Sequence, residues 1–217
     1  MSQRIVIVAG GCWSEEEAAL LRSDDMLVGV DAGAVHLLEA GRVPDLVVGD
    51  FDTVSVETYR QLQAKGVPIH SLPTAKDVTD THHAVDWALA RRPQQILLLG
   101  ALGGSRFDHA LANLFLLERM ADAGISGLIQ DAHNRIQLHP GNNTVITVEA
   151  SPFRYLSLLA LTTRVEGVTL RGFRYPLQEA VLIRDFPLGI SNELEVEKGH
   201  IQVRTGKLLL IESRDHP

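Results

Sequence analysis

Two aspartates spaced i, i+2 follow an apolar segment in the first quarter of the chain. Val47 and Val48 precede Gly49, and Asp50 and Asp52 come next. In extended backbone, side chains at i and i+2 point to the same side, so the two carboxylates can converge beyond the end of a strand. Like charges that close repel each other unless a cation or a proton lies between them. Oxygen-only ligands suit Mg²⁺, which usually binds together with phosphates. The alternative is that these residues only cap turns.

A second polar segment, residues 76–80, opens a predicted helix over 79–91. Asp77 or Thr79 suits the N-cap, and an acid at Asp80 is favoured by the positive end of the helix dipole. A helix N-terminus also receives phosphate, and Lys76 beside it can contact a phosphate oxygen as a point charge. The segment is therefore either a helix cap or part of a phosphate site.

A glycine-rich segment, residues 100–109, follows a strongly apolar run. Gly103 and Gly104 let backbone N–H groups approach an anion closely, and Arg106 can bridge two phosphate oxygens. The segment has neither the GxGxxG nor the GxxxxGK[ST] pattern, so the dinucleotide and Walker A mechanisms do not apply. His109 taken alone is more typical of a packed or capping residue than of a base.

The elements that must position these residues change character near residue 140. Before it, apolar runs alternate with amphipathic segments. Strands are predicted at 5–8, 26–30, 46–48, 67–70, 96–99 and 127–130. Helices are predicted at 14–21, 33–39, 57–65, 79–91 and 107–122. This repeated order predicts an α/β domain over 1–135 with a mainly parallel, Rossmann-like sheet and helices on both faces.

Short segments rich in Val, Leu, Ile and Thr follow and predict an all-β sandwich over 140–217, or a barrel. The predicted strands are 144–149, 155–161, 166–170, 181–183, 194–196, 200–204 and 207–211. The boundary is expected between 133 and 143, without a long linker.

Acidic residues follow three of the predicted strands in the α/β part. Asp31 follows 26–30, Asp50 follows 46–48, and Asp131 follows the last strand. Open α/β sheets bind ligands beyond the carboxyl ends of their strands, so an acidic rim is expected there. Each acid alone would be more typical of a helix N-cap.

Composition limits the possible partners. The chain has 217 residues, 45% of them hydrophobic and 22% charged, with a net charge of −7. No run of Lys and Arg stands out, so no nucleic-acid partner is expected. No apolar run approaches the roughly 18 residues of a membrane span, so no membrane partner is expected. Cys12, the single cysteine, excludes an intramolecular disulfide. We expect a cytoplasmic protein.

Several spaced motifs resemble, in order, those of thiamine pyrophosphokinases. They are 31–34 (DAGA), 49–53 (GDFDT), 76–80 (KDVTD), 103–109 (GGSRFDH) with Asn113, 172–177 (GFRYPL) and 189–193 (GISNE), the last two like the bacterial form of the family. The resemblance spans almost the whole chain. It departs from the family at Ala32 and Val35, where glycine and asparagine are usual. Some members stack thiamine on a C-terminal tryptophan, whereas Trp13 and Trp87 here lie in the first part.

The resemblance implies a nucleotide-binding α/β domain, a C-terminal β-sandwich, and a homodimer with active sites shared between subunits. It implies transfer of the terminal pyrophosphoryl unit of ATP to the hydroxyl of thiamine, with release of AMP. Asp50, Asp52 and Asp77 match the catalytic acids that bind Mg²⁺ and the triphosphate. The residues expected around ATP are Asp31, Lys76, Thr79, Asp80, Arg106, Asp108 and His109. Those expected at thiamine are Ser191 and Asn192, with Tyr175, Phe173 or Phe186 as the aromatic wall.

Other assignments remain open from the residues alone. Residues 50–54 also resemble the DxDx[TV] motif of haloacid-dehalogenase-like phosphatases, in which Asp50 would be the nucleophile and Asp52 the acid/base. A pyrophosphokinase for another heterocyclic alcohol, such as a pterin, is a closer alternative. A non-catalytic nucleotide sensor is disfavoured, because binding alone does not require so many acids near a phosphate. Asp77 or Asp50 could take the hydroxyl proton, and the sequence does not choose between them.

Overall fold

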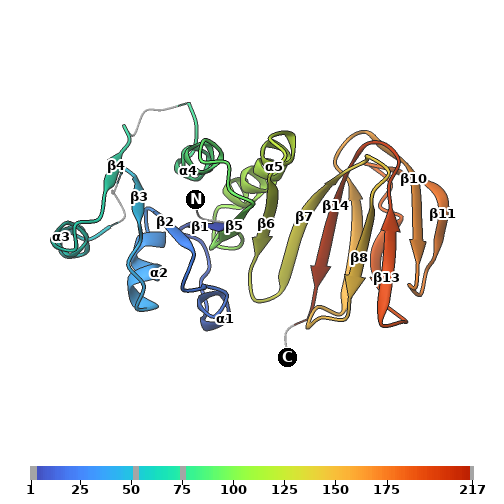
Figure 1. The fold of residues 1–217 in the computed structure, drawn as a ribbon, viewed down its shortest axis with the longest axis horizontal. Helices are drawn as coiled ribbons and strands as arrows, with labels where there is room; N and C mark the ends of the chain where they lie inside the picture. Colours follow the sequence, from blue (N-terminus) through green and yellow to red (C-terminus); the bar gives the residue numbers. More distant parts are fainter. Residues whose placement is uncertain (1–3, 51–53, 74–76, 216–217) are drawn as a thin grey trace. The chain divides into compact units, whose positions relative to one another are not determined.

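The computed structural model describes residues 4–50, 54–73 and 77–215 and divides into two compact units (Figure 1). The first unit ends at Ala132 and the second begins at His133.

Strands and helices alternate in the first unit, as the sequence predicts. The strands are β1 (Arg4–Val8), β2 (Met26–Val30), β3 (Leu46–Gly49), β4 (Ile69–Ser71), β5 (Gln95–Leu99) and β6 (Ser126–Gln130). The helices are α1 (Glu15–Ala18), α2 (Gly33–Glu39), α3 (Val56–Ala64), α4 (Asp80–Leu89) and α5 (Phe107–Asp122). Among the described residues the order is β6-β5-β1-β2-β3-β4 and every pairing in this unit is parallel.

This strand order creates a crevice beside β1. The chain passes outward from β1 to β4 and then crosses back, so that β5 pairs with the other edge of β1. Because the segments that follow β1 and β5 lead to opposite sides, their carboxyl ends form the kind of switch point where α/β sheets bind ligands.

Both faces of the sheet are covered. Val6 and Val8 pack into one core cluster with Leu37 of α2, whereas Ile5 and Ile7 alternate with them and are also buried. Figure 1 shows α2 and α4 on opposite sides of these strands. A strand buried on both faces is apolar throughout, which explains the uninterrupted run in β1.

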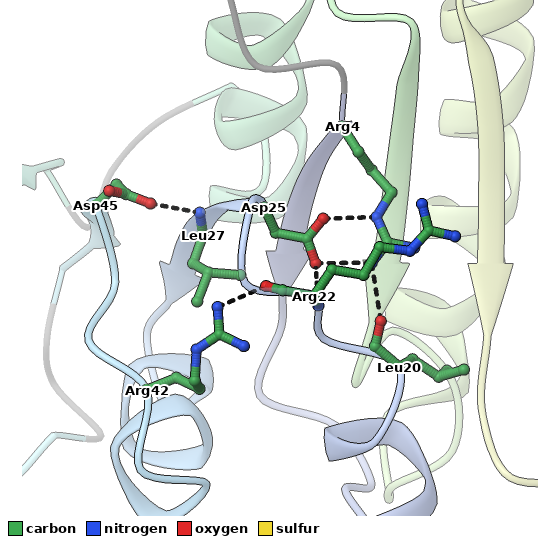
Figure 2. A network of polar contacts seen from close by, with 7 residues as sticks. All are labelled: Arg4, Leu20, Arg22, Asp25, Leu27, Arg42 and Asp45. Atoms are coloured by element: carbon green, nitrogen blue, oxygen red, sulfur yellow. Dashed lines mark hydrogen bonds and ion pairs between the residues drawn. The ribbon is translucent and has the colours of Figure 1, made fainter.

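Polar contacts fasten the amino-terminal ends of β1, β2 and β3 (Figure 2). Arg4 donates from Nε and Nη2 to the two carboxylate oxygens of Asp25, each at 2.7 Å. Asp25 also accepts the Arg22 backbone N–H at 2.6 Å, and Asp45 accepts that of Leu27 at 2.7 Å. These contacts lie at the end of the strands remote from the crevice.

The second unit is all-β, as predicted. Its strands are β7 (Asn134–Pro140), β8 (Val145–Glu149), β9 (Tyr155–Ala160), β10 (Arg164–Arg171), β11 (Leu177–Ile183), β12 (Gly189–Glu193), β13 (Lys198–Gln202) and β14 (Lys207–Ser213). They form antiparallel layers with the orders β12-β9-β14-β7 and β11-β10-β13-β8. Leu158 and Leu210 of the first layer share a core cluster with Val168 and Ile201 of the second, which is a sandwich-like arrangement.

Three local predictions were wrong in this unit. Residues 134–140 form β7, which pairs with β14 in the stretch where the sequence predicts only a boundary. Residues 189–193, which lie outside every predicted strand, form β12, because their backbone pairs with β9 despite the small polar side chains. Residues 194–196, expected as a strand, belong to no strand apart from one bridge at Leu194. In the described part of the chain, no helix has the length and apolar character needed to cross a membrane.

Candidate active site

A cavity of about 840 Å³ opens at the carboxyl ends of the parallel strands in the first unit. Its lining combines two glycine-containing turns with the starts of α2, α4 and α5. The predicted site residues that line it are Asp31, Asp50, Asp77, Thr79, Asp80, Arg106 and His109. A volume of this size lies within the usual range of small-molecule sites.

The turns after β1 and β5 are joined to each other along one wall of this cavity. The N–H of Gly11 donates to the carbonyl of Gly100 at 2.8 Å, and the N–H of Cys12 donates to that of Leu102 at 3.3 Å. A Cβ on Gly11 would lie 2.4 Å from the Gly100 oxygen, so only glycine permits this approach. Gly100 itself has a φ of 59°, which glycine adopts without strain.

The ends of β2 and β3 bring two acids to the cavity. Asp31 has a φ of 47°, and its N–H donates to the Val48 carbonyl at 3.0 Å, which fastens it to β3. A Cβ on Gly49 would lie 1.8 Å from Asp31 Oδ1. Gly49 therefore makes room for the Asp31 carboxylate immediately before Asp50.

Two helix starts complete the lining. Thr79 is the N-cap of α4, with Oγ1 accepting the His82 N–H at 3.1 Å. α5 begins after Arg106, and the buried Asn113, nearly two turns further on, donates from Nδ2 to the Ala101 carbonyl at 2.9 Å. The sequence predicts both helix starts, and the Asn113 contact explains how α5 is held against the glycine turn.

Arg106 is paired within its own turn. It donates from Nε to Asp108 Oδ1 at 3.0 Å and from Nη2 to Oδ2 at 2.6 Å. These bonds lower the pKa of the Asp108 carboxyl to about 2 and raise that of the guanidinium. Asp108 is not among the lining residues; it orients Arg106, which is.

Glu17 is a buried residue that the sequence analysis did not single out. It lies in α1 with 2% of its surface exposed, and it accepts the Gly100 N–H at Oε1 at 3.1 Å. Burial raises the pKa of the Glu17 carboxyl, and the hydrogen bonds from Gly100 and Ser14 partly oppose this. An acid in a short amphipathic segment gives no sequence signal for this role, because its partner lies 83 residues away.

The charged side chains of the lining are mainly acidic. Among the described lining residues, four are aspartates and one is an arginine. A polyanion entering such a site needs additional positive charge, and carboxylate oxygens are the ligands that Mg²⁺ prefers. Within the described residues no three acids, imidazoles or thiols converge as a ready metal site. Asp52 and Lys76, both predicted site residues, lie outside the described residues.

Comparison with known proteins identifies the family. Residues 18–128 match the family description "Thiamin pyrophosphokinase, catalytic domain", and residues 143–210 match "Thiamin pyrophosphokinase, vitamin B1 binding domain". A curated thiamine pyrophosphokinase from Bacillus subtilis is 35% identical over 188 residues, covering 87% of each chain. The chain belongs to the thiamine pyrophosphokinase family.

Solved structures of thiamine pyrophosphokinases agree. The crystal structure of the Bacillus subtilis protein superposes with a TM-score of 0.90 at 33% identity, covering 98% of this chain and 100% of that one. The Geobacillus thermodenitrificans protein gives a TM-score of 0.86 at 35% identity, with 98% of each chain covered. Neither the phosphatase nor the pterin alternative is favoured by these likenesses.

The remaining predicted residues lie in the second unit, inside the segment that matches the vitamin B1 binding domain. Tyr175 and Ser191 are exposed, whereas Asn192 is 5% exposed. The Asn192 amide holds the backbone of Tyr175: Oδ1 accepts its N–H at 3.0 Å, and Nδ2 donates to its carbonyl at 2.8 Å.

Proposed function

We propose that this protein transfers the pyrophosphoryl unit of ATP to the hydroxyl of thiamine, giving thiamine diphosphate and AMP. The observation that carries the proposal is the cavity that joins four aspartates, a glycine turn and Arg106 at the switch point of the sheet. Membership of the thiamine pyrophosphokinase family supplies the identity of the acceptor alcohol. The parallel order of the first unit also supports describing it as Rossmann-like.

The phosphate end of the site fits Mg²⁺. Asp50 and Asp77 line the cavity with hard oxygen donors, and Asp52 follows Asp50 by two residues. These three residues would hold the ion, which when bound neutralises charge on the phosphates. Gly103 and Gly104, both at positive φ, let the backbone approach phosphate closely, and Arg106 contacts the phosphate oxygens.

The chain's own residues then position the reaction. The thiamine hydroxyl oxygen forms a bond to the β-phosphorus, the bond from that phosphorus to the oxygen of AMP breaks, and the hydroxyl proton passes to a carboxylate. Asp50 or Asp77 takes the proton, since both line the cavity. Much of the rate comes from holding the hydroxyl and the phosphate in line.

The thiamine site is formed at Ser191, Asn192 and Tyr175 of the second unit, with the Tyr175 ring facing the thiazolium cation. We propose that the protein is a cytoplasmic homodimer. In it, these residues of one subunit complete the active site that contains the ATP-binding residues of the partner. Exposed apolar side chains support an interface. Phe107, Leu111 and Phe115 recur along α5, and Phe186 and Leu188 precede β12. Contiguous exposed apolar surface commonly marks an interaction site.

A coupled assay for AMP release tests the proposed reaction. The purified protein is incubated with ATP and Mg²⁺ together with thiamine, with a pterin alcohol, or with no acceptor. AMP should accumulate in step with thiamine diphosphate in the first reaction alone. Release with the pterin alcohol, or phosphate release without an acceptor, would assign the site to one of the alternatives.

A mixed dimer tests the sharing of sites. An Asp52→Asn subunit is combined with a Ser191→Ala/Asn192→Ala subunit, each inactive alone. Sharing leaves one intact site and one doubly damaged site in each heterodimer, restoring up to about half of the native activity. No recovery in verified heterodimers would mean that each site is built within one chain.

A further inference from the structure

The edge strand β12 contains a bulge at Ser191. Gly189 pairs with Leu158 and Asn192 pairs with Leu156, so Ile190 and Ser191 together oppose Ser157 of β9. Ser191 has a φ of 54°, a left-handed conformation that is unfavourable for most residues other than glycine. Bulges of this kind occur at sheet edges, where they re-aim a side chain.

Ser157 satisfies the backbone group that the bulge removes from the ladder. The N–H of Ser191 donates to Ser157 Oγ at 3.0 Å, and Ser157 is 9% exposed. A buried hydroxyl thus takes the place of a strand carbonyl. The contact joins residues 34 apart in the sequence and fixes Ser191 in its left-handed conformation.

Asn192 fixes the other side of the bulge. Its Oδ1 accepts the N–H groups of Tyr175 and Glu193, at 3.0 and 2.9 Å, and its Nδ2 donates to the Tyr175 carbonyl at 2.8 Å. An amide oxygen has two lone pairs, and both are engaged here. Since Asn192 is also 5% exposed, its amide is committed to the protein.

We propose that Ser157 and Asn192 are positioning residues, which hold Ser191 and Tyr175 in place as the side chains that contact thiamine. This inference rests on the proposed function and refines it: of the pair Ser191 and Asn192, the first contacts the ligand and the second shapes the bulge. Ser157, which no sequence motif includes, becomes part of the thiamine site through the Ser191 backbone.

Steady-state kinetics of Ser157→Ala and Ser157→Thr test the positioning role of Ser157. Ser157→Ala should raise KM for thiamine about tenfold, the loss expected from one buried hydrogen bond. KM for ATP and kcat should change less than about twofold. Ser157→Thr keeps the hydroxyl and should stay within about threefold of the wild type. An equal rise in both KM values would show general damage and overturn the proposal.

A double-mutant cycle separates positioning from direct contact. If Ser157 acts only through Ser191, Ser157→Ala should add less than about twofold to KM for thiamine in a Ser191→Ala background. An undiminished tenfold effect there would refute the assignment. Amide-resolved hydrogen exchange gives a readout that does not need activity: the Ser191 N–H should exchange faster in Ser157→Ala. Unchanged exchange would mean that the bond is not formed.

Asn192→Asp distinguishes the two roles of Asn192 by the sign of its effect. A carboxylate touching the thiazolium cation would lower KM for thiamine. In the positioning role, the new oxygen faces the Tyr175 carbonyl where Nδ2 used to donate, so KM should rise about tenfold or more. Asn143→Asp, an exposed residue of the same unit, controls for the added charge. Failure of the wild-type AMP assay would refute the proposed function itself, independently of these variants.

Discussion

β2 and β3 each have one aspartate just before the strand and another just after it. The aspartates at the two ends have different roles. At the amino-terminal ends, Asp25 and Asp45 satisfy backbone N–H groups, and Asp25 also pairs with Arg4 (Figure 2). At the carboxyl-terminal ends, Asp31 and Asp50 line the cavity. The aspartates at the amino-terminal ends bond to groups of the protein itself, whereas those at the carboxyl-terminal ends line the candidate ligand site.

The difference follows from strand direction. At the amino-terminal ends, the backbone N–H groups of Arg22 and Leu27 donate to the carboxylates of Asp25 and Asp45. At the carboxyl-terminal ends, the strands lead through Gly49 and the glycine turns into helix starts. Helix starts and glycine turns offer positive electrostatic potential to anions, and under the proposed function the acids placed there would bind the cation that accompanies the phosphates. We therefore expect substitutions at the two ends to affect different properties.

The largest expected effect is on turnover, from Asp50→Asn or Asp77→Asn at the carboxyl-terminal end. The amide keeps the shape and removes the charge, so kcat should fall about a thousandfold. The melting temperature should change by less than about 2 °C, because the carboxylates face a cavity. Both quantities are measured on the same preparation. Near-native kcat at saturating Mg²⁺ would remove the acids from the reaction.

The opposite result is expected from Asp25→Asn at the amino-terminal end. Removing one partner of a buried ion pair costs about 3–5 kcal/mol. In a protein of this size 1 kcal/mol corresponds to about 2–4 °C, so the melting temperature should fall by roughly 6 °C or more. Below that temperature kcat/KM should stay within about twofold of the wild type. If Asp25→Asn lost activity without losing stability, the distinction between the two ends of the strands would be contradicted.

Local patterns predicted most of the first unit and much of its site. α2 and α5 begin and end where helical periodicity places them, and the acids after β2 and β3 line the cavity as the strand-end rule requires. Asp131, expected at the same rim after β6, is not among the described lining residues. Such features depend on nearest neighbours in the sequence. The resemblance added the acceptor and the second unit's residues, neither of which follows from periodicity.

The missed features depend on pairings between distant segments. The Gly10–Gly11 turn gains its role only because β5 pairs with β1, and Glu17 gains its role only through Gly100. The segment 189–193 looks like a loop because its side chains are small and polar. It is a strand because its backbone pairs with that of β9. At the bulge, where the Ser191 N–H has no strand carbonyl, the Ser157 hydroxyl accepts it instead.

Arg106 should affect ATP binding with an intermediate magnitude. Arg106→Ala should raise KM for ATP about thirtyfold, and Arg106→Lys should fall between it and the wild type because lysine keeps the charge and loses the planar fork. Since the pKa of Asp108 is about 2, the Arg106–Asp108 ion pair stays charged over the pH range of the assay. It is lost only as Asp108 becomes protonated when the pH falls toward that value. The pH profile of the wild type between 6 and 9 should therefore show no step from this pair. Unchanged KM for ATP in Arg106→Ala would make the turn structural only.

The smallest expected effect concerns Glu17. This buried acid lies near the carboxyl-terminal ends of the parallel strands, but it accepts a backbone N–H as Asp25 and Asp45 do at the amino-terminal ends. Its folded-state pKa is raised by burial, so the folded protein holds the Glu17 proton more tightly than the unfolded chain does. Ionisation therefore costs stability, and this cost grows as the pH rises from the unfolded value of about 4.3 through the raised folded value. Glu17→Gln keeps an oxygen for the Gly100 N–H and carries no charge.

The melting temperature of Glu17→Gln relative to the wild type should therefore depend on pH. The difference should be smallest near pH 4.5 and should grow in favour of the variant as the pH rises to 8. Glu15→Gln, an exposed acid in the same helix, should show no such trend. Turnover should stay within about threefold in Glu17→Gln, because the Gly100 turn keeps its acceptor, and should fall further in Glu17→Ala, which loses it. A variant that is less stable at pH 8 than the wild type would show that the charge itself holds the turn, which would place Glu17 with the ion-paired acids of the amino-terminal end.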